Sequence, residues 1–209
     1  LNKDCFHTGL NLKVLKTIKF FKYEAIKEVF QKKQDLIVIG VSSKGIDWIA
    51  EELKKNSLNE ELPPLLMLTK GLSINKNKYE LLVDKLTRLL SQKNITNINL
   101  SAVGGPCLAA GLANRVQSGV VIASKNLDTA ESLKNMLATN YYRISTTTDV
   151  IGVEICAAIK NIFSMAIGAA SGLNKNSLKD NTYLNTSAAL VRQSIYEMEI
   201  FVDFLKGKK

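Results

Sequence analysis

Short apolar runs alternate with amphipathic segments over the first three-quarters of the chain. The segment Asp35–Val41, DLIVIGV, is apolar at nearly every position, which is typical of a strand buried on both faces of a sheet. Similar runs predict further strands at Leu65–Thr69, Ile98–Val103, Gly119–Ala123 and Tyr142–Thr146, with a weaker one at Val14–Phe20. Helical spacing predicts helices at Tyr23–Lys33, Ile46–Lys55, Tyr79–Gln92, Cys107–Arg115 and Asp128–Leu137. Strands that alternate with helices predict an α/β fold with a doubly wound (Rossmann-like), mostly parallel sheet.

The pattern changes after Thr148, where the strand-like runs stop. An almost wholly apolar helix is predicted at Val150–Gly172, then a polar connector at Leu173–Asp180 and a second helix from about Thr182 to Leu205. We therefore expect an α/β domain over residues 1–148 and an all-helical domain over residues 149–209. Ligands of such proteins bind in the cleft between the two parts, outside the carboxyl ends of the strands.

One lysine, Lys160, stands near the middle of the apolar helix. An unpaired ammonium in an apolar interior costs several kcal/mol, so such a lysine has either a structural partner or a chemical task. Asn161 is adjacent in sequence, Ser164 follows one turn later, and Glu154 lies near the same helical line as Asn161. The helix is therefore predicted to carry a narrow polar facet on a surface otherwise built for burial.

The apolar helix is also long enough to cross a bilayer. Glu154 and Lys160 would each cost roughly 2.5–3.5 kcal/mol at its centre, and neither a second span nor a leader peptide is evident. We expect no membrane span. Small residues along the helix suit close packing inside a helical domain: Gly152, Ala157, Ala158, Ala166, Gly168, Ala169 and Ala170.

Composition narrows the class of protein. The 209 residues are 46% hydrophobic and carry a net charge of +9, but the lysines are scattered and there are few arginines, so we do not expect nucleic-acid binding. A generally basic surface favours an anionic small molecule instead. Cys5, Cys107 and Cys156 form no CxxC pair, which favours reduced thiols, a cytoplasmic location and no bound metal.

Two strand ends carry candidate binding residues. Lys70 follows the predicted strand Leu65–Thr69 and can hold an anion there, although a solvated lysine is common at such a position. The turn Gly104–Pro106 follows another strand and allows close approach of a ligand, but a plain tight turn uses the same residues. The segment Gly40–Gly45 is not a phosphate loop, because Ile and Asp follow it where Lys and Ser or Thr are required. We do not expect the lone histidine, His7, to be catalytic.

In their order along the chain, several motifs resemble those of NAD(P)-dependent glycerol-3-phosphate dehydrogenases. The most specific is DVIGVEICAAIKN at Asp149–Asn161. The others are LTKG at Leu68–Gly71, GGPCLA at Gly104–Ala109, DLIVIGVSSKG at Asp35–Gly45 and, more weakly, NTSAALVRQSIYEM at Asn185–Met198. The resemblance implies reversible hydride transfer between NADH or NADPH and dihydroxyacetone phosphate, in glycerol-3-phosphate metabolism and phospholipid biosynthesis, by a protein that is a homodimer when complete.

The resemblance also assigns roles. Lys160 is implied to be the acid/base lysine that exchanges a proton with the substrate oxygen, and Lys70 a second lysine that contacts substrate and cofactor. Gly105 and Cys107 are implied to contact the phosphorylated substrate, and the backbone amide of Ala109 the dinucleotide. Position 107 usually carries a hydroxyl in this family, and a thiol is a weaker hydrogen-bonding partner. Ala110 and Gly111 stand where the family often has Lys and Glu.

Other parts of the family pattern are not matched. No GxGxxG-type turn is found, and the family's phosphate-binding Arg-Asn pair and nearby aspartate lie downstream of Lys209. We therefore expect an incomplete dinucleotide-binding domain followed by the start of a substrate-binding domain, as in a fragment, a truncated reading or a degenerate copy that is inactive alone. Without the family's first strand, Asp35–Val41 should be left with an unpaired apolar edge.

Two alternatives remain. One is a related two-domain dehydrogenase that acts on another small hydroxy acid or alcohol. The other is a non-catalytic remnant that binds a protein partner through its exposed sheet edge or helical face.

Overall fold

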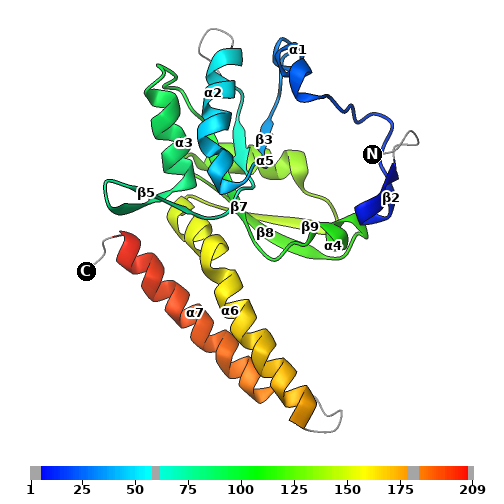
Figure 1. Ribbon diagram of the computed structural model, residues 1–209, viewed down its shortest axis with the longest axis vertical. Helices are drawn as coiled ribbons and strands as arrows, with labels where there is room; N and C mark the ends of the chain where they lie inside the picture. Colours follow the sequence, from blue (N-terminus) through cyan, green and yellow to red (C-terminus); the bar gives the residue numbers. More distant parts are fainter. Residues whose placement is uncertain (1–5, 58–61, 178–183, 207–209) are drawn as a thin grey trace.

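A mixed α/β unit and a long helical hairpin make up the chain (Figure 1). The computed structural model describes residues 6–57, 62–177 and 184–206. Its main sheet has five strands in the order β3-β4-β7-β8-β9. Their bounds are Ile37–Ile39 (β3), Leu65–Met67 (β4), Leu100–Gly104 (β7), Ser118–Ser124 (β8) and Tyr142–Thr147 (β9). The predicted α/β class is confirmed.

Helices join and cover these strands. They are α1 (Ile26–Phe30), α2 (Ile46–Asn56), α3 (Leu82–Ser91), α4 (Ala109–Ala113), α5 (Leu127–Leu137), α6 (Val150–Ser177) and α7 (Asn185–Lys206), with 3-10 turns at Thr8–Leu10, Tyr23–Ala25 and Ser43–Gly45. Two small hairpins complete the fold: β1 (Phe6–His7) with β2 (Leu12–Lys13), and β5 (Leu72–Asn75) with β6 (Lys78–Leu81).

The sheet is parallel except at one pair. Strands β3, β4 and β7 are parallel, β8 is antiparallel to β7, and β9 is parallel to β8. The carboxyl ends of β3, β4 and β7 therefore share one edge of the sheet, while β8 and β9 run the opposite way. The register pairs Thr147 of β9 with Ala123 of β8, and Ala123 with Ala102 of β7. Strand β9 therefore ends level with Ala102, the middle of β7, and not at the carboxyl edge. The chain then turns into α6, which runs toward the carboxyl end of β7.

Two apolar cores lie on the two faces of the sheet. The larger one packs α2, α3 and the first residue of α6 against the sheet through fully buried side chains such as Leu53, Leu86 and Leu90. The smaller one packs α5 against β8 and β9 around Ile122 and Leu133. The start of α6 therefore belongs to the core of the α/β unit, although the sequence pattern assigns it to the second domain.

Two predicted elements are wrong. Val14–Phe20 is not a strand: it pairs with no described strand, and Leu15 is 72% exposed. The predicted helix at Tyr79–Gln92 begins only at Leu82, because the preceding residues form the β5–β6 hairpin. Lys76 and Asn77, in its two-residue turn, both have positive φ, as a tight hairpin requires.

The helical hairpin also differs from the prediction. Helix α6 continues to Ser177, through most of the predicted connector, whose last residues (178–180) and the expected helix start at Thr182 lie outside the described residues. Beyond Lys160 most of α6 is exposed, so the expected close packing of its small residues holds only for the first turns. There the helix has passed the sheet and packs mainly against α7 (Figure 1).

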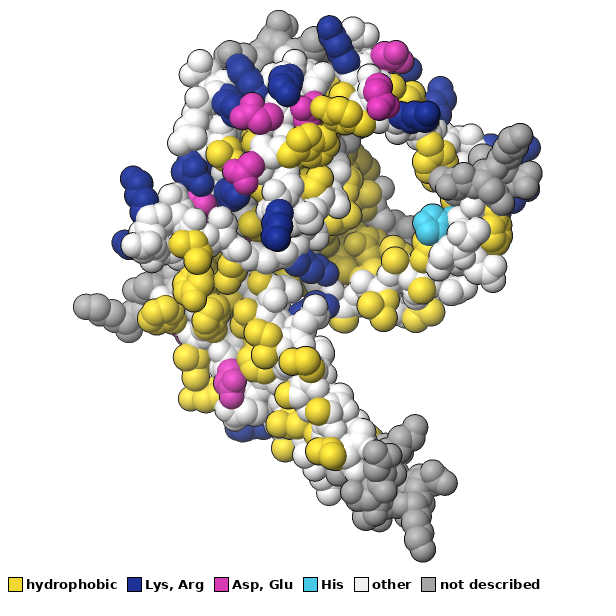
Figure 2. All heavy atoms as spheres, in the orientation of Figure 1, with side chains coloured by type: hydrophobic (Ala, Val, Ile, Leu, Met, Phe, Trp, Pro, Cys, Tyr) yellow, Lys and Arg dark blue, Asp and Glu magenta, His cyan; other side chains and the backbone are white. Residues whose placement is uncertain are grey.

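One described helix, Val150–Leu173, is long and apolar enough by length and composition to cross a membrane, and 22% of its most apolar window is buried in this structure. Its first residue, Val150, is buried in the larger core, and Val153 packs against that core. Hydrophobic side chains are spread over the rest of α6 and over α7 (Figure 2).

Gly105 is required by the close packing of the strands. Its φ is +144°, and a Cβ placed on it would lie 2.7 Å from the carbonyl oxygen of Gly119 and 2.8 Å from the Cα of Val120. Both contacts are with backbone, which cannot rotate away.

We expect Gly105→Ala to lower the free energy of unfolding by about 1–3 kcal/mol or more. Gly168→Ala is the matched control: Gly168 lies in α6 with open space around it, so alanine should stabilise the helix by roughly 0.5–1 kcal/mol. Urea unfolding followed by circular dichroism measures both. Equal stability of Gly105→Ala and the parent chain would contradict the packing argument.

Candidate functional site

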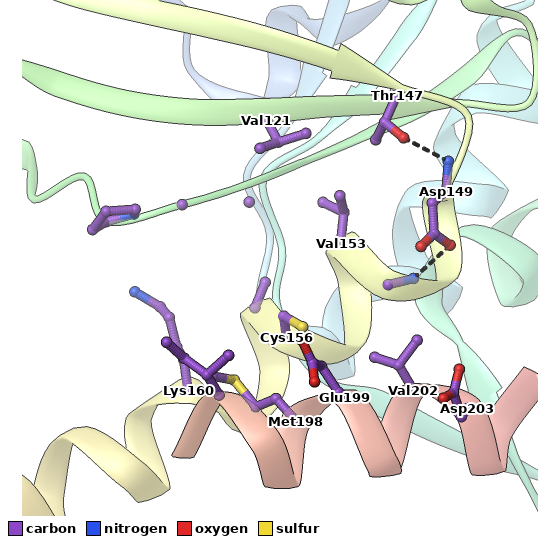
Figure 3. Close-up of a pocket in the computed structure, with 16 residues that line it drawn as sticks. Val121, Thr147, Asp149, Val153, Cys156, Lys160, Met198, Glu199, Val202 and Asp203 are labelled. Carbon is purple, nitrogen blue, oxygen red and sulfur yellow. Dashed lines mark hydrogen bonds between the residues drawn. The ribbon is translucent and has the colours of Figure 1, made fainter. Parts of the chain in front are cut away.

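A cavity of about 800 Å³ lies where α6 and α7 meet the carboxyl end of β7. Its walls come from the turn Gly104–Pro106, from one face of α6 between Gly152 and Lys160, and from α7 between Ile195 and Asp203 (Figure 3). Its lining is mostly apolar. Asp149 and Lys160 lie at opposite ends of the group in this view. A cleft with few polar groups at the end of a parallel strand is a typical place for a small ligand.

The start of α6 is fixed by hydrogen bonds at the Asp149 end of the cavity. The Asp149 carboxylate accepts from the backbone N–H of Gly152 at 3.0 Å and so caps the helix, while the Asp149 N–H donates to the Thr147 hydroxyl at 3.1 Å (Figure 3). A Cβ on Gly152 would overlap the Asp149 carboxylate, so a side chain there would displace the carboxylate from its capping position.

Helix α6 then packs directly on the end of β7. A Cβ on Gly104 would lie 3.0 Å from Val153 and 3.4 Å from Ala157, so the helix approaches the strand closely because Gly104 has no side chain. Val153 already lies over Gly104, the last residue of β7, and Lys160 follows seven residues, about 10 Å of helix, later. Lys160 is therefore carried past the end of β7, at the shared carboxyl edge.

Lys160 and Lys70 approach one another at this edge. Lys160 is half-buried in the cavity wall, and Lys70 follows β4. Although Lys70 is exposed as a residue, partial burial of its ammonium lowers its pKa, and the nearby ammonium of Lys160 lowers the pKa further. Two lysines within electrostatic range of one another favour binding of an anion at this edge. The structure therefore brings together the two lysines that the sequence singled out.

The other predicted site residues, Gly105, Cys107 and Ala109, lie in the turn and short helix that follow β7. Gly105 lines the cavity. However, glycine is needed there because of the close contact with β8 and the positive φ, whether or not a ligand binds. Cys107 is half-buried and lies within electrostatic range of the Lys70 ammonium. Ala109 is exposed and opens the short helix α4. The predicted helix at Cys107–Arg115 is thus shorter than expected.

Loops after β3 and β4 form the rest of this edge. The Thr69 hydroxyl donates to the carbonyl of Val41 at 2.6 Å, which ties the two loops together. Gly71 has a φ of +137°, and a Cβ there would meet Ser43 at 3.5 Å. The segment Gly40–Gly45 therefore lines the open edge beside Lys70 without forming a phosphate loop.

The predicted polar facet on α6 is wrong in one respect. Asn161 and Ser164 are exposed, whereas Glu154 is 6% exposed and packs against α3. Residues seven apart do share a helical line, but the surroundings change along the helix, because α3 covers it only at its start.

Several cavity residues were not foreseen. The Thr147–Asp149 pair could have been recognised, because an Asp just before an apolar helix is a helix-capping signal. Met198, Glu199 and Asp203 come from α7, and the sequence does not say which face of that helix turns to the cavity (Figure 3). Within the described residues, no group of three His, Cys, Asp or Glu side chains can hold a metal. His7 accepts a hydrogen bond from the Leu10 N–H in the β1–β2 hairpin.

Comparison with known families gives two matches. Residues 10–130 match the N-terminal domain, and residues 149–209 the C-terminal domain, of NAD-dependent glycerol-3-phosphate dehydrogenase. Together these ranges include every site residue that the sequence analysis proposed.

Individual relatives agree. A glycerol-3-phosphate dehydrogenase (NAD(P)+) of Clostridium botulinum is 26% identical over 199 residues, which cover 95% of this chain and 54% of that protein. An NADP(+)-dependent glycerol-3-phosphate dehydrogenase of Archaeoglobus fulgidus is 26% identical over 203 residues, covering 97% of this chain and 58% of that protein. The structure of glycerol-3-phosphate dehydrogenase from Plasmodium falciparum superposes with a TM-score of 0.67 at 26% identity, covering 84% of this chain and 45% of that one. The chain thus spans little more than half the length of these two curated relatives.

Burial of Glu154 predicts a pH-dependent stability. Burial raises its pKa to about 8, the nearby Asp84 adds to the rise, and hydrogen bonds from the backbone amides of Val83 and Leu82 oppose it. The folded protein therefore holds a proton that the unfolded chain, with a pKa near 4.5, has released. We expect this group's contribution to the free energy of unfolding to fall as the pH rises from about 4.5 to about 8.

In Glu154→Gln this pH dependence should flatten. Urea unfolding of both proteins at several pH values measures it. Parallel curves for the two proteins would contradict the raised pKa.

Proposed function

Since the chain belongs to the NAD-dependent glycerol-3-phosphate dehydrogenase family, we propose that its site serves reversible hydride transfer between NAD(P)H and dihydroxyacetone phosphate, forming glycerol 3-phosphate. The observation that carries the proposal is the approach of Lys160 to Lys70 at the carboxyl edge of β3, β4 and β7. This edge is where open α/β sheets bind dinucleotides and their substrates.

The described residues fit one end of a dinucleotide. The loop Gly40–Gly45, the Lys70–Gly71 turn and the Ala109 amide line the open edge. The positive φ of Gly71 favours glycine there, which has no side chain to obstruct a ligand. We assign cofactor contacts to Lys70 and Ala109. When bound, the reduced nicotinamide supplies the hydride. The names of the relatives support both NAD and NADP, so the choice between them stays open.

Lys160 is the group that we propose moves the proton. In the reductive direction, hydride adds to the substrate carbonyl carbon, the C=O π bond breaks, and the oxygen takes a proton from the Lys160 ammonium. In the oxidative direction the neutral amine takes that proton back. Lys70, whose ammonium is partly desolvated, polarises the carbonyl and holds the developing negative charge.

The two lysines also favour an anionic substrate. Lys160 lines the cavity and Lys70 lies within its electrostatic range, and the repulsion between the two ammonium groups is relieved when an anion binds near them. We propose that Gly105 and Cys107 contact the phosphorylated substrate beside them. A thiol at position 107 is a weak hydrogen-bonding partner, so this contact should add little affinity.

The proposal extends to the domain boundary, the cellular location and the oligomeric state. We place the domain boundary between residues 148 and 149, which is supported by the change from strands to helices there. We also propose a cytoplasmic homodimer without a membrane span. This is supported by the packing of the first turns of α6 on the sheet and by the exposed apolar side chains of α7, such as Ile200 and Phe204.

Replacing Lys160 should remove turnover. In dihydroxyacetone-phosphate-dependent NADH oxidation by the purified chain, Lys160→Ala should lower kcat by roughly 10²–10⁴-fold, because the proton donor is lost. Lys27→Ala, at an exposed position on α1, is the control and should leave the rate unchanged. Full activity in Lys160→Ala would refute the role of this lysine. An inactive parent chain would leave the family membership standing and favour a fragment or a non-catalytic remnant.

The substrate class has its own test. If two cations select the phosphate, dihydroxyacetone phosphate should have a kcat/KM at least about 10²-fold above that of dihydroxyacetone, and the ratio should shrink as salt rises. Equal use of both ketones would instead favour a related dehydrogenase of unphosphorylated hydroxy compounds.

A further inference from the structure

Glu154 joins α6 to a part of the chain far away in sequence. It lies in the second turn of α6, 6% exposed, and its two carboxyl oxygens accept from the backbone N–H of Val83 at 3.3 and 3.2 Å. Val83 is the second residue of α3, and the residue before that helix, Leu81, has no side-chain oxygen to cap it. Glu154 therefore supplies the cap that α3 lacks, across 71 residues of sequence.

The hydrogen bond between Glu154 and Val83 depends on direction, whereas the apolar contacts around it do not. Around it α6 is held by apolar packing, with Ile155 fully buried and Ala157 against Gly104. Apolar contacts tolerate small slides and rotations of a helix, whereas a hydrogen bond to the end of another helix has a narrow range of distance and angle. Of these contacts, the Glu154 hydrogen bonds therefore define the rotation of α6 about its axis most narrowly.

Lys160 follows six residues later on the same rigid helix. Beyond it α6 is mostly exposed and packs mainly against α7, so the α/β unit holds Lys160 in place through the turns before it. Six residues turn a helix by about 600°, which places Glu154 and Lys160 on different faces. While Glu154 faces α3, Lys160 faces the cavity and Lys70.

We propose that Glu154 is a positioning residue for Lys160: by capping α3 it fixes the rotation and depth of α6, and so the distance of the Lys160 amine from Lys70 and the substrate. The inference rests on the proposed function of this site. It gives a buried acidic group, whose burial costs free energy, a task in the reaction besides the capping of α3.

The chemistry of the hydrogen bond between the Glu154 carboxyl and the Val83 N–H supports this role. Burial raises the pKa of Glu154 to about 8, so near neutral pH the group is mainly an uncharged carboxyl whose carbonyl oxygen accepts the bond. A neutral acceptor of the same shape should therefore suffice. Glutamine keeps such an oxygen, and leucine has a similar volume but no acceptor, so the two substitutions separate the hydrogen bond from packing.

The test uses the full chain with Glu154→Leu and Glu154→Gln. Each protein is trace-labelled with acetic anhydride, and the labelling of Lys160 is compared by mass spectrometry with that of Lys27, an exposed lysine on α1. The same samples are assayed for dihydroxyacetone-phosphate-dependent NADH oxidation, with kcat and both KM values resolved. Circular dichroism reports whether each variant is folded, and Glu154→Asp, which is one methylene too short to reach Val83, replaces the leucine variant if that variant is unfolded.

The proposal expects a change at Lys160 alone. In Glu154→Leu its labelling relative to Lys27 should change by roughly twofold or more, since an amine's reactivity depends on its hydration and on neighbouring charges. Its kcat should fall about tenfold or more with the KM for NADH unchanged, since small misplacements of a reacting group are costly. Glu154→Gln should restore both towards the parent values.

Two results would overturn it: labelling of Lys160 that is the same in Glu154→Leu and the parent chain, or an equal change in the leucine and glutamine variants. If no protein, the parent included, oxidises NADH, the proposed reaction fails, but the labelling still decides whether Glu154 positions Lys160.

Discussion

The close approach of α6 to the end of β7 is the constraint on which the rest of the structure depends. It is possible because Gly104 has no side chain where Val153 and Ala157 pass over it. With the helix seated there, Asp149 can cap its first turn, Val150 enters the larger core, and Glu154 reaches α3. A bulkier residue at position 104 would lift the helix and loosen all of these contacts together, because interiors are packed at nearly crystalline density.

The antiparallel pairing of β8 with β7 decides in which direction α6 runs along the sheet, and so where Lys160 lies. Because β8 and β9 run against β7, the chain leaves β9 level with the middle of β7, and α6 runs back toward the carboxyl end of β7. Lys160 therefore arrives at the edge where β3, β4 and β7 end, beside Lys70. In a fully parallel sheet, β9 would end at the carboxyl edge, and a helix of this length would carry its lysine away from Lys70.

The free energy of the site is balanced between burial and charge. Lys70 and Lys160 lie within electrostatic range of one another, and their mutual repulsion would be relieved by a bound anion. Beyond them, α6 and α7 carry exposed apolar side chains that are available for further packing (Figure 2). Strand β3 is an edge strand whose one partner among the described strands is β4, with Val38 47% exposed, as the unpaired apolar run of the sequence implied. The two lysines would be stabilised by a bound anion, and the exposed apolar surfaces by packing against a partner, more than either is by folding of the chain alone.

What the sequence determined by itself was local. Continuous apolar runs located the five strands of the main sheet, helical spacing located most helices, and the motif ending in Lys160 pointed to the site, because burial and periodicity are written in neighbouring residues. The tertiary structure decided which residues meet. It turned the start of the Tyr79 segment into a hairpin strand, reversed β8, placed Met198 and Glu199 on the cavity wall, and separated Glu154 from Asn161. These outcomes depend on partners far away in the chain, and one-dimensional patterns carry no information about which distant element will cover a given face.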